Sequence, residues 1–315
     1  MAGALRLAAL RLPQIALTLL LLSLAAWFAI GLMPGDPVSL ALVSDPRLTA
    51  EDAARLRALH GLDQPLLTRY LAWGAGVLRG EFGYSRLFAQ PVGAVLWPAL
   101  RATLALVGAA VALAALLGVA LGGLAARRPR AAPLVQAAAL LGQAVPSFWL
   151  GILLVILFAV TLGWLPAGGL PEPGQSALPF LVLPVATIAF GHMAAYARHA
   201  ATALRAELAR PHITAARARG NGEGRILWRH ALPNAAVPLL TLLALDAGAL
   251  VSGALVTETL FARPGMGKLL YDAVMGNDYN LALLALLLVA LVTMLATLAA
   301  DLAQAWIDPR IGEGR

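Results

Sequence analysis

The sequence predicts an all-α integral membrane protein with six transmembrane helices. Hydrophobic residues make up 60% of its 315 residues and charged residues only 12%, and the mean hydropathy is +0.80. A soluble core would not need so much apolar surface. The apolar residues fall into long runs rich in Leu and Ala, without the two-residue alternation of an outer-membrane barrel.

Six of these runs are long enough to cross ~30 Å of hydrocarbon, which takes about 20 helical residues. We expect the spans at Gln14–Met33, Ala102–Ala126, Leu134–Leu162, Ala177–Ala197, Asn234–Thr257 and Asn280–Ile307. The first run follows Arg6 and Arg11, as in a signal peptide, but it is longer than a signal core and no clear cleavage site precedes Pro34. We therefore expect an uncleaved first span. The absence of cysteine excludes disulfides and thiolate metal sites.

The distribution of arginine predicts which side each loop faces. With six spans, one side holds both termini, the 127–133 loop and the 198–233 segment, all rich in arginine. The short loops of the other side contain Arg263 and Lys268. The positive-inside rule therefore places both termini and the 198–233 segment in the cytoplasm. The net charge of +7 follows from this topology and from anionic lipid, and it requires no nucleic-acid partner.

The long segment between the first two spans, residues 34–101, is expected to lie outside. Thr49 and Asp52 have the spacing of a capping box at the start of a helix. A second, amphipathic helix is expected after Pro65. Its residues on or near one face are Leu67, Tyr70, Leu71, Gly74 and Leu78. These helices either lie at the outer membrane surface, with aromatic anchors, or form a docking lip for a partner.

We divide the chain into residues 1–101, the first span with its external segment, and residues 102–315, a five-helix core that includes the 198–233 loop. Within this loop, Ile213–Ala235 is polar and rich in arginine, yet it lies between two membrane-length runs. We interpret it as a surface for a cytoplasmic partner. Gly220 permits a tight turn there, because glycine adopts positive φ or allows close backbone approach. Pro233 can start the fifth span, where its missing N–H costs little.

Two parts of this loop and nine further segments, in order, resemble one family of transporters. In the loop they are AARARG at 215–220 and RHALPNA at 229–235. Elsewhere they are MPGDPV (33–38), HGLDQPL (60–66), GEFGYS (80–85), QPV (90–92), PSFWLG (146–151), LGWLPAGG (162–169), ETLFARPGMGKLL (258–270), NDYN (277–280) and DPRIG (308–312). The chain thus resembles permease subunits of bacterial ABC importers, in their dipeptide, oligopeptide and nickel branch. Thr214 and His230 depart from the family's general Glu-Ala-Ala loop, and NDYN replaces an Arg-Asp-Tyr-Pro.

The resemblance implies that the loop carries a short coupling helix, which docks in a groove of an ATP-binding subunit. The residues implied in ATPase coupling are Ala215, Ala216, Arg217, Ala218, Arg219, Gly220, Asn221, Gly222, Leu232 and Pro233. The implied partners are a second homologous permease subunit or an identical copy, two ATP-binding cassette ATPase subunits, an extracytoplasmic substrate-binding protein and membrane lipid. The chain itself is expected to hold no cofactor and to be no enzyme, with ATP and Mg used by the partner ATPases.

A nucleotide site within this chain is not expected. Gly267 and Lys268 form the pair found in a P-loop, but Ala262 replaces the first glycine and Leu269 replaces the Ser or Thr. We expect this segment to be a bend in an external loop. As a hypothesis, the residues that form the external loop and gate are Glu258, Pro264, Gly265, Gly267, Asp278 and Tyr279.

Asp246 lies near the centre of the fifth expected span, where an ionised side chain costs ~2.5 to 3.5 kcal/mol. One hypothesis is that it lines the translocation path and favours substrates with an amine or another cation. The other is a protonated or hydrogen-bonded acid that locks the helix bundle. His192 and His199 are expected near the cytoplasmic end of the fourth span, as interfacial histidines rather than metal ligands.

Small residues predict where helices approach closely. They recur at near-GxxxG spacing on the second and fifth spans, at Gly118, Gly122 and Gly123 and at Gly248, Ser252 and Gly253.

The expected function is uptake of di- or oligopeptides across the bacterial cytoplasmic (inner) membrane, by alternating access. A nickel chelate, glutathione or another small solute is the alternative cargo, because the same permease pattern serves them all. An alternative of another class is a secondary transporter that works alone. It predicts an inverted repeat and paired intramembrane charges, and no such repeat is seen.

Overall fold

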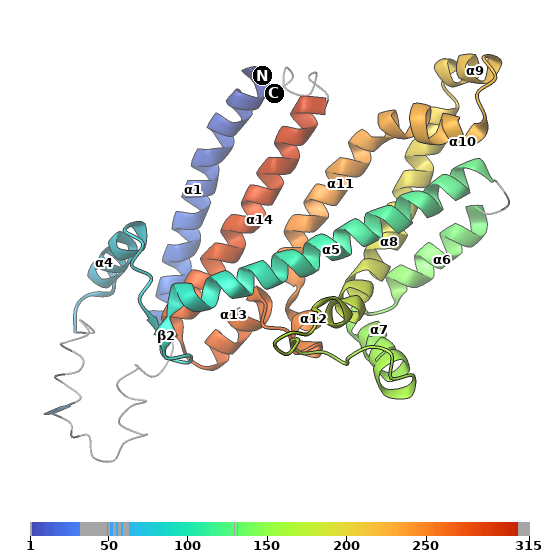
Figure 1. Ribbon diagram of the computed structural model, residues 1–315. Coiled ribbons are helices and arrows are strands. Elements are labelled where there is room, and N and C mark those ends of the chain that lie inside the picture. The colour runs from blue at the N-terminus through green and yellow to red at the C-terminus, as the bar shows by residue number, and fades with distance from the viewer. Residues whose placement is uncertain are drawn as a thin grey trace.

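The computed structural model describes residues 2–31, 63–128 and 132–307, together with positions 49, 51, 52, 55, 58 and 130. Helices dominate this part of the chain, and the strands are a two-residue antiparallel pair (Figure 1). In chain order the elements are α1 (Ala2–Gly31), α4 (Leu66–Leu78), β1 (Tyr84–Ser85), β2 (Gln90–Pro91), α5 (Val92–Arg127), α6 (Ala132–Ala144), α7 (Ser147–Leu154), the π-helix η1 (Val155–Thr161), α8 (Leu178–Leu208), α9 (Pro211–Ala218), α10 (Glu223–Arg225), the π-helix η2 (Ile226–Ala231), α11 (Leu232–Gly253), α12 (Leu255–Leu260), α13 (Met266–Met275) and α14 (Tyr279–Ile307).

Within the described part of the chain, four helices are long and apolar enough to cross a membrane. They span Leu7–Gly31, Val92–Arg127, Leu178–Leu208 and Tyr279–Gln304. Two further pairs of helices pass the same test only together, each with a bend at a short break. The count rises to six if each bent pair is one span, which agrees with the expected number.

The third expected span, Leu134–Leu162, is wrong as one continuous helix. The chain bends by 96° between Ala132–Ala144 and Ser147–Thr161. Pro146 explains the break, because its ring disfavours helical backbone in the preceding residue and it has no N–H to donate. With 13 residues, α6 is only about 20 Å long at 1.5 Å per residue, so it is too short to cross the hydrocarbon alone.

The fifth expected span, Asn234–Thr257, is also interrupted. The chain bends by 58° between Glu223–Ala236 and Pro238–Val251, and α11 ends at Gly253, with α12 beginning at Leu255. Pro238 lies inside α11 and cannot donate to the carbonyl one turn earlier, which accounts for the bend. Pro233 lies in the first turn of α11, as expected.

The other helices extend beyond their expected bounds. α1 and α5 begin twelve and ten residues earlier than the apolar runs indicate, and α8 continues eleven residues further, to Leu208. Polar residues at a helix end do not stop the helix, so apolar content alone gives its boundaries poorly. The longer α8 also places His192 near the helix middle rather than near its cytoplasmic end.

The external segment is described only in part. Thr49 and Asp52 form the expected reciprocal cap, with each backbone N–H donating to the other side chain, at 3.0 and 3.2 Å. Most of the helix expected to follow lies outside the described residues, as do the segments 33–38 and 308–312. The amphipathic helix after Pro65 is confirmed as α4.

Figure 1 shows the two ends of the helical bundle. α1 begins, α14 ends and α9 lies at one end, whereas α4, the strand pair, α12 and α13 lie at the other. The arginine-rich loops thus share an end with both terminal helix ends. We call the end with α9 the inner end and the opposite one the outer end.

α5 and α8 form the most extensive helix pair, and two of the expected small residues lie in it. A Cβ atom added to Gly118 would lie 2.9 Å from the carbonyl oxygen of Met193, and one on Gly122 would lie 2.7 Å from that of Ala197. Both distances are too short for real Cβ contacts, so the two backbones approach as closely as glycine alone allows. Gly248 on α11 has a looser contact with α14, 3.3 Å from the carbonyl oxygen of Thr293.

We predict that Gly122→Leu lowers the stability of the protein, because its side chain must push α8 away from α5. Overpacking of this kind costs roughly 1–3 kcal/mol, and the apparent melting temperature of the detergent-purified protein measures it. Gly108→Leu on the same helix is the control, since Gly108 is exposed and has open space around it. Equal melting temperatures for the two variants would contradict the close contact.

Candidate functional site

A tight turn after α9 organises the inner end. Gly220 has a φ of +80°, and open space surrounds the position of its missing Cβ. Positive φ, and not close approach of another backbone, is therefore what requires glycine here. Asn221 closes the turn, because its backbone N–H and its side-chain amide both donate to the carbonyl oxygen of Ala216, at 3.3 and 3.0 Å.

α9 is anchored on one side and exposed on the other. Ile213 and Ala216 are buried, and Ile213 packs in an apolar cluster with Leu204 of α8 and with Ile226 and Leu227 of η2. The exposed residues of α9 and its turn include Ala215, Arg217, Ala218, Arg219, Gly220 and Gly222. Most of the residues that the sequence assigned to coupling therefore form one exposed, cationic surface. Leu232 and Pro233 lie at the start of α11 instead.

An ion pair links α9 to α10 across this turn. Arg217 donates from Nε and Nη2 to the two carboxylate oxygens of Glu223, at 2.7 and 3.3 Å. The hydrogen bond from Arg217 lowers the pKa of the Glu223 carboxyl. Both side chains are nearly half exposed, so the pair contributes only ~0.2–1 kcal/mol to stability. This contribution is present at neutral pH and is lost as the pH falls through the lowered pKa of Glu223.

Asp246 has a partner that the sequence did not indicate. Nδ1 of His192, on α8, lies 3.2 Å from Oδ2 of Asp246, on α11. The two side chains are 32% and 25% exposed, so neither is sealed in the core. Tyr196, one turn further along α8, is almost fully buried, and its hydroxyl interacts with Asp246. Its ring lies beside that of His192, with centroids 6.2 Å apart.

This cluster joins three polar side chains near the middle of two long apolar helices. A charged side chain at such depth is costly unless it is paired or faces water. His192 supplies the pairing, yet the partial exposure of both groups leaves the carboxylate accessible. The arrangement suits a polar site within the membrane-spanning region.

At the outer end, the carboxylate of Glu258 joins three helices. Glu258 lies on α12 and is completely buried. Its Oε1 accepts a hydrogen bond from the hydroxyl of Thr103 on α5, and its Oε2 accepts one from the backbone N–H of Lys268 on α13, at 3.0 Å. The Thr103 hydroxyl in turn accepts from the backbone N–H of Met266, at 2.8 Å.

Two glycines make room for this network. A Cβ atom on Gly265 would lie 2.0 Å from Oε1 of Glu258, and one on Gly267 would lie 2.7 Å from the backbone of Leu255. Pro264, by contrast, is exposed. The bend expected in the external loop is therefore built around a buried carboxylate, and it brings Glu258, Gly265 and Gly267 together.

Asp278 forms a second buried junction at the outer end. Its Oδ1 accepts the backbone N–H of Leu281 at 3.3 Å, which caps the first turn of α14. Its Oδ2 accepts the Ser85 hydroxyl and the backbone N–H of Leu87, at 2.5 and 3.0 Å. The hydroxyl of Tyr279 lies 3.5 Å from Oδ1 of Asn277. Asp278 thus fixes the strand pair to α14.

The sequence motifs did not indicate the long-range contacts of three residues. Thr103 and His192 act through contacts between distant helices, and Asn280 links α4 to α14 in the same way. The amide of Asn280 accepts from Trp73 at 3.1 Å and donates to the carbonyl oxygen of Phe82 at 2.8 Å. No local sequence pattern indicates contacts of this kind.

Most of this chain has counterparts in known proteins. Residues 114–313 match the family described as "Binding-protein-dependent transport system inner membrane component". The chain belongs to this family. It is accordingly a permease, a multi-pass component of a bacterial inner membrane and part of an ABC importer that depends on a binding protein.

Several relatives of this permease are similar over most of its length. The oligopeptide transport system permease protein AppB of Bacillus subtilis is 32% identical over 88% of this chain and 90% of its own length. The probable D,D-dipeptide transport system permease protein DdpB of Escherichia coli is 35% identical over 90% of each chain. The glutathione transport system permease protein GsiC of Salmonella paratyphi A is 34% identical, over 93% of this chain and 94% of its own.

A solved structure shows the same fold. A chain of the MetNI methionine ABC transporter, in an inward-facing conformation, aligns with 69% of this permease and 98% of its own length. The TM-score is 0.58 and the sequence identity 21%, so the likeness is one of fold.

We predict that Gly265→Ala abolishes uptake by the permease, because its methyl group would occupy the space of the Glu258 carboxylate and leave buried donors unpaired. Loss of such a network costs ~1–3 kcal/mol for each unsatisfied group. Uptake by cells, together with immunoblots of the membrane fraction, measures the effect. Gly253→Ala is the control, because the space around Gly253 is open. Normal uptake by Gly265→Ala would refute the role of the network.

Proposed function

We propose that this chain is one half of the pore of an importer of di- or oligopeptides. The observation that carries the proposal is the similarity, along about nine-tenths of the chain, to relatives named as oligopeptide and dipeptide permeases. The relative named for glutathione keeps a small solute as the alternative cargo. The second half of the pore is a homologous subunit or an identical copy.

The inner end receives force from ATPase subunits. The exposed, cationic side of α9 is a surface that a partner can grip, while Ile213 and Ala216 fix the opposite side to the bundle. A push on α9 therefore reaches α8 and η2 through the apolar cluster around Ile213. In this scheme both termini and α9 are cytoplasmic, and ATP and Mg are used by two partner ATPases.

The outer end receives substrate from an extracytoplasmic binding protein. The junctions at Glu258 and Asp278 tie α5, α12, α13, α14 and the strand pair into one unit. Such a unit moves as a body when the helices below it rotate, as a gate requires. Between the two ends, the Asp246–His192 pair lines the translocation path and favours substrates with an amine or another cation.

The cargo is tested most directly on the binding protein that serves this permease. We expect dipeptides or oligopeptides to raise its melting temperature in a thermal-shift screen that also contains nickel salts, nickel chelates and glutathione. A shift with a nickel compound or glutathione alone would replace peptide as the cargo while leaving the type of importer unchanged.

For coupling, we predict that Gly220→Val abolishes substrate-stimulated ATPase activity of the reconstituted importer. A β-branched residue is strained at positive φ, so the turn after α9 must rearrange. Gly163→Val carries the same strain at a φ of +63° in another loop, also in open space, and is the matched control. Full stimulation in the Gly220 variant would argue against the α9 surface as the site of coupling.

For the path, we predict that Asp246→Asn and Asp246→Leu lower peptide uptake about tenfold, an effect of ~1.4 kcal/mol. His192→Gln should alter uptake less, because it leaves the carboxylate in place. Asp301→Asn is the control, since Asp301 pairs with Arg11 at the inner end, at 2.8 Å. Wild-type uptake with unchanged substrate preference in both Asp246 variants would leave only a packing role.

A further inference from the structure

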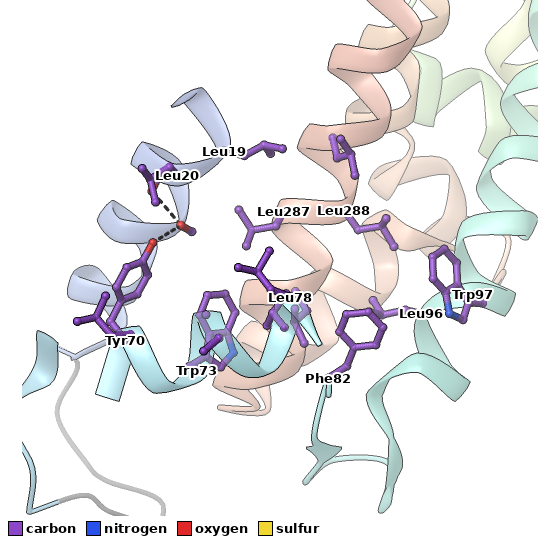
Figure 2. Close-up of a pocket in the computed structure, with 17 residues that line it drawn as sticks. Leu19, Leu20, Tyr70, Trp73, Leu78, Phe82, Leu96, Trp97, Leu287 and Leu288 are labelled. Atoms are coloured by element: carbon purple, nitrogen blue, oxygen red, sulfur yellow. Dashed lines mark hydrogen bonds between the residues drawn. The ribbon is translucent and has the colours of Figure 1, made fainter. Parts of the chain in front are cut away.

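An apolar groove runs between α1, α4, α5 and α14 near the outer end (Figure 2). Its volume is about 730 Å³, within the range of ~300–1,000 Å³ that holds small organic ligands. Leu19 and Leu20 of α1 line one wall, Leu287 and Leu288 of α14 line the back, and Trp97 of α5 lies at the far side. α4 forms the floor.

The polar atoms of Ser23, Tyr70 and Trp73 in the groove already have partners. The hydroxyl of Ser23 donates to the carbonyl oxygen of Leu20 at 2.8 Å, and its oxygen lies 2.8 Å from the hydroxyl of Tyr70. The indole N–H of Trp73 donates to Asn280. These groups need nothing from a ligand, so the groove offers an occupant mainly apolar contact.

Water and a protein helix are both poor occupants. Water needs two to four polar partners in a cavity, and apolar cavities stay dry. A helix about 10 Å across would fill the 730 Å³ of the groove with only about six residues. A membrane-spanning helix of a second subunit has about 20 residues, so most of it would lie outside the groove. A flexible hydrocarbon chain needs no polar partners and is thin enough to lie within the groove. The bilayer around the permease supplies such chains.

The surroundings of the groove also fit a phospholipid. Trp27, Tyr70 and Trp73 form an aromatic cluster with ring centroids 5.4–6.1 Å apart, and such side chains gather at the level of lipid head groups. Arg69, beside Tyr70 on α4, is half-buried, and its charge suits a lipid phosphate. Leu71 and Leu78 of α4 are exposed at 61% and 91%, so the rim of the groove is also apolar.

We propose that the groove is a binding site for one acyl chain of a phospholipid, which joins α1 and α4 to the rest of the bundle. The extensive contact of α1 is with α14, its contact with α4 is small, and its contact with α5 is smaller still. The acyl chain fills the space between α1 and α5 and so completes the packing of the first helix. The site is independent of the cargo and of the coupling surface.

Gly74 provides the variant that tests the site. It lines the groove, and nothing lies within 4 Å of its missing Cβ, so Gly74→Leu places a branched side chain where the acyl chain would lie. Leucine also favours helix over glycine, so α4 should fold. Gly108→Leu is the matched control, because Gly108 is also a helical glycine with open space around its missing Cβ but lies outside the groove.

The measurement is native mass spectrometry of the assembled importer purified in mild detergent. We expect the wild type and Gly108→Leu to retain a phospholipid that Gly74→Leu loses. Exhaustive delipidation should lower the melting temperature of the wild type more than that of Gly74→Leu, which fills the groove itself. Equal lipid retention by both variants, or no retained lipid in the wild type, would overturn the proposal.

A photo-crosslinking amino acid in place of Leu287 identifies the occupant in intact membranes. An adduct with phospholipid supports the site. An adduct with a second permease subunit, or with another segment of this chain, would show that protein covers the groove and would overturn the proposal.

Discussion

The close contact of α5 with α8 is the constraint on which the rest of the structure depends. Gly118 and Gly122 let the two longest of the described helices meet backbone to backbone, and several functional features are attached to one of them. α5 carries Thr103, which anchors the outer junction. α8 carries His192 in mid-span and leads into α9. Any change in the angle between these helices therefore moves both ends of the permease together.

The two ends are held by different physical means. At the outer end, buried carboxylates of Glu258 and Asp278 accept hydrogen bonds from segments far apart in the chain, and such junctions tolerate little displacement because each lost bond leaves a buried polar group unpaired. At the inner end, Ile213 is held by apolar contacts that can slide, and the Arg217–Glu223 ion pair is nearly half exposed. The outer end is thus suited to sealing, and the inner end to transmitting movement.

The helical membrane-protein class and the inner turn could be predicted because they depend on local properties. The length of an apolar run identifies a span. Gly220 identifies the turn after α9, and Pro233 identifies the start of α11. The breaks at Pro146 and Pro238 were missed because apolar content continues through them, although each proline marked its own break. The His192–Asp246 pair could not be predicted, since its members are brought together only by the crossing of α8 and α11. The roles of Thr103 and Asn280 depend on distant segments in the same way.

The length of α8 has a consequence for the assembly. Its 31 residues measure about 46 Å at 1.5 Å per residue, roughly 16 Å more than the hydrocarbon is thick. α8 is therefore a spacer that sets how far from the bilayer the α9 surface stands. It also sets the direction in which that surface points, since one residue more or less would rotate α9 about the α8 axis by ~100°. The number of residues in α8 thus sets both the distance and the direction of the α9 surface that a partner outside the membrane would meet.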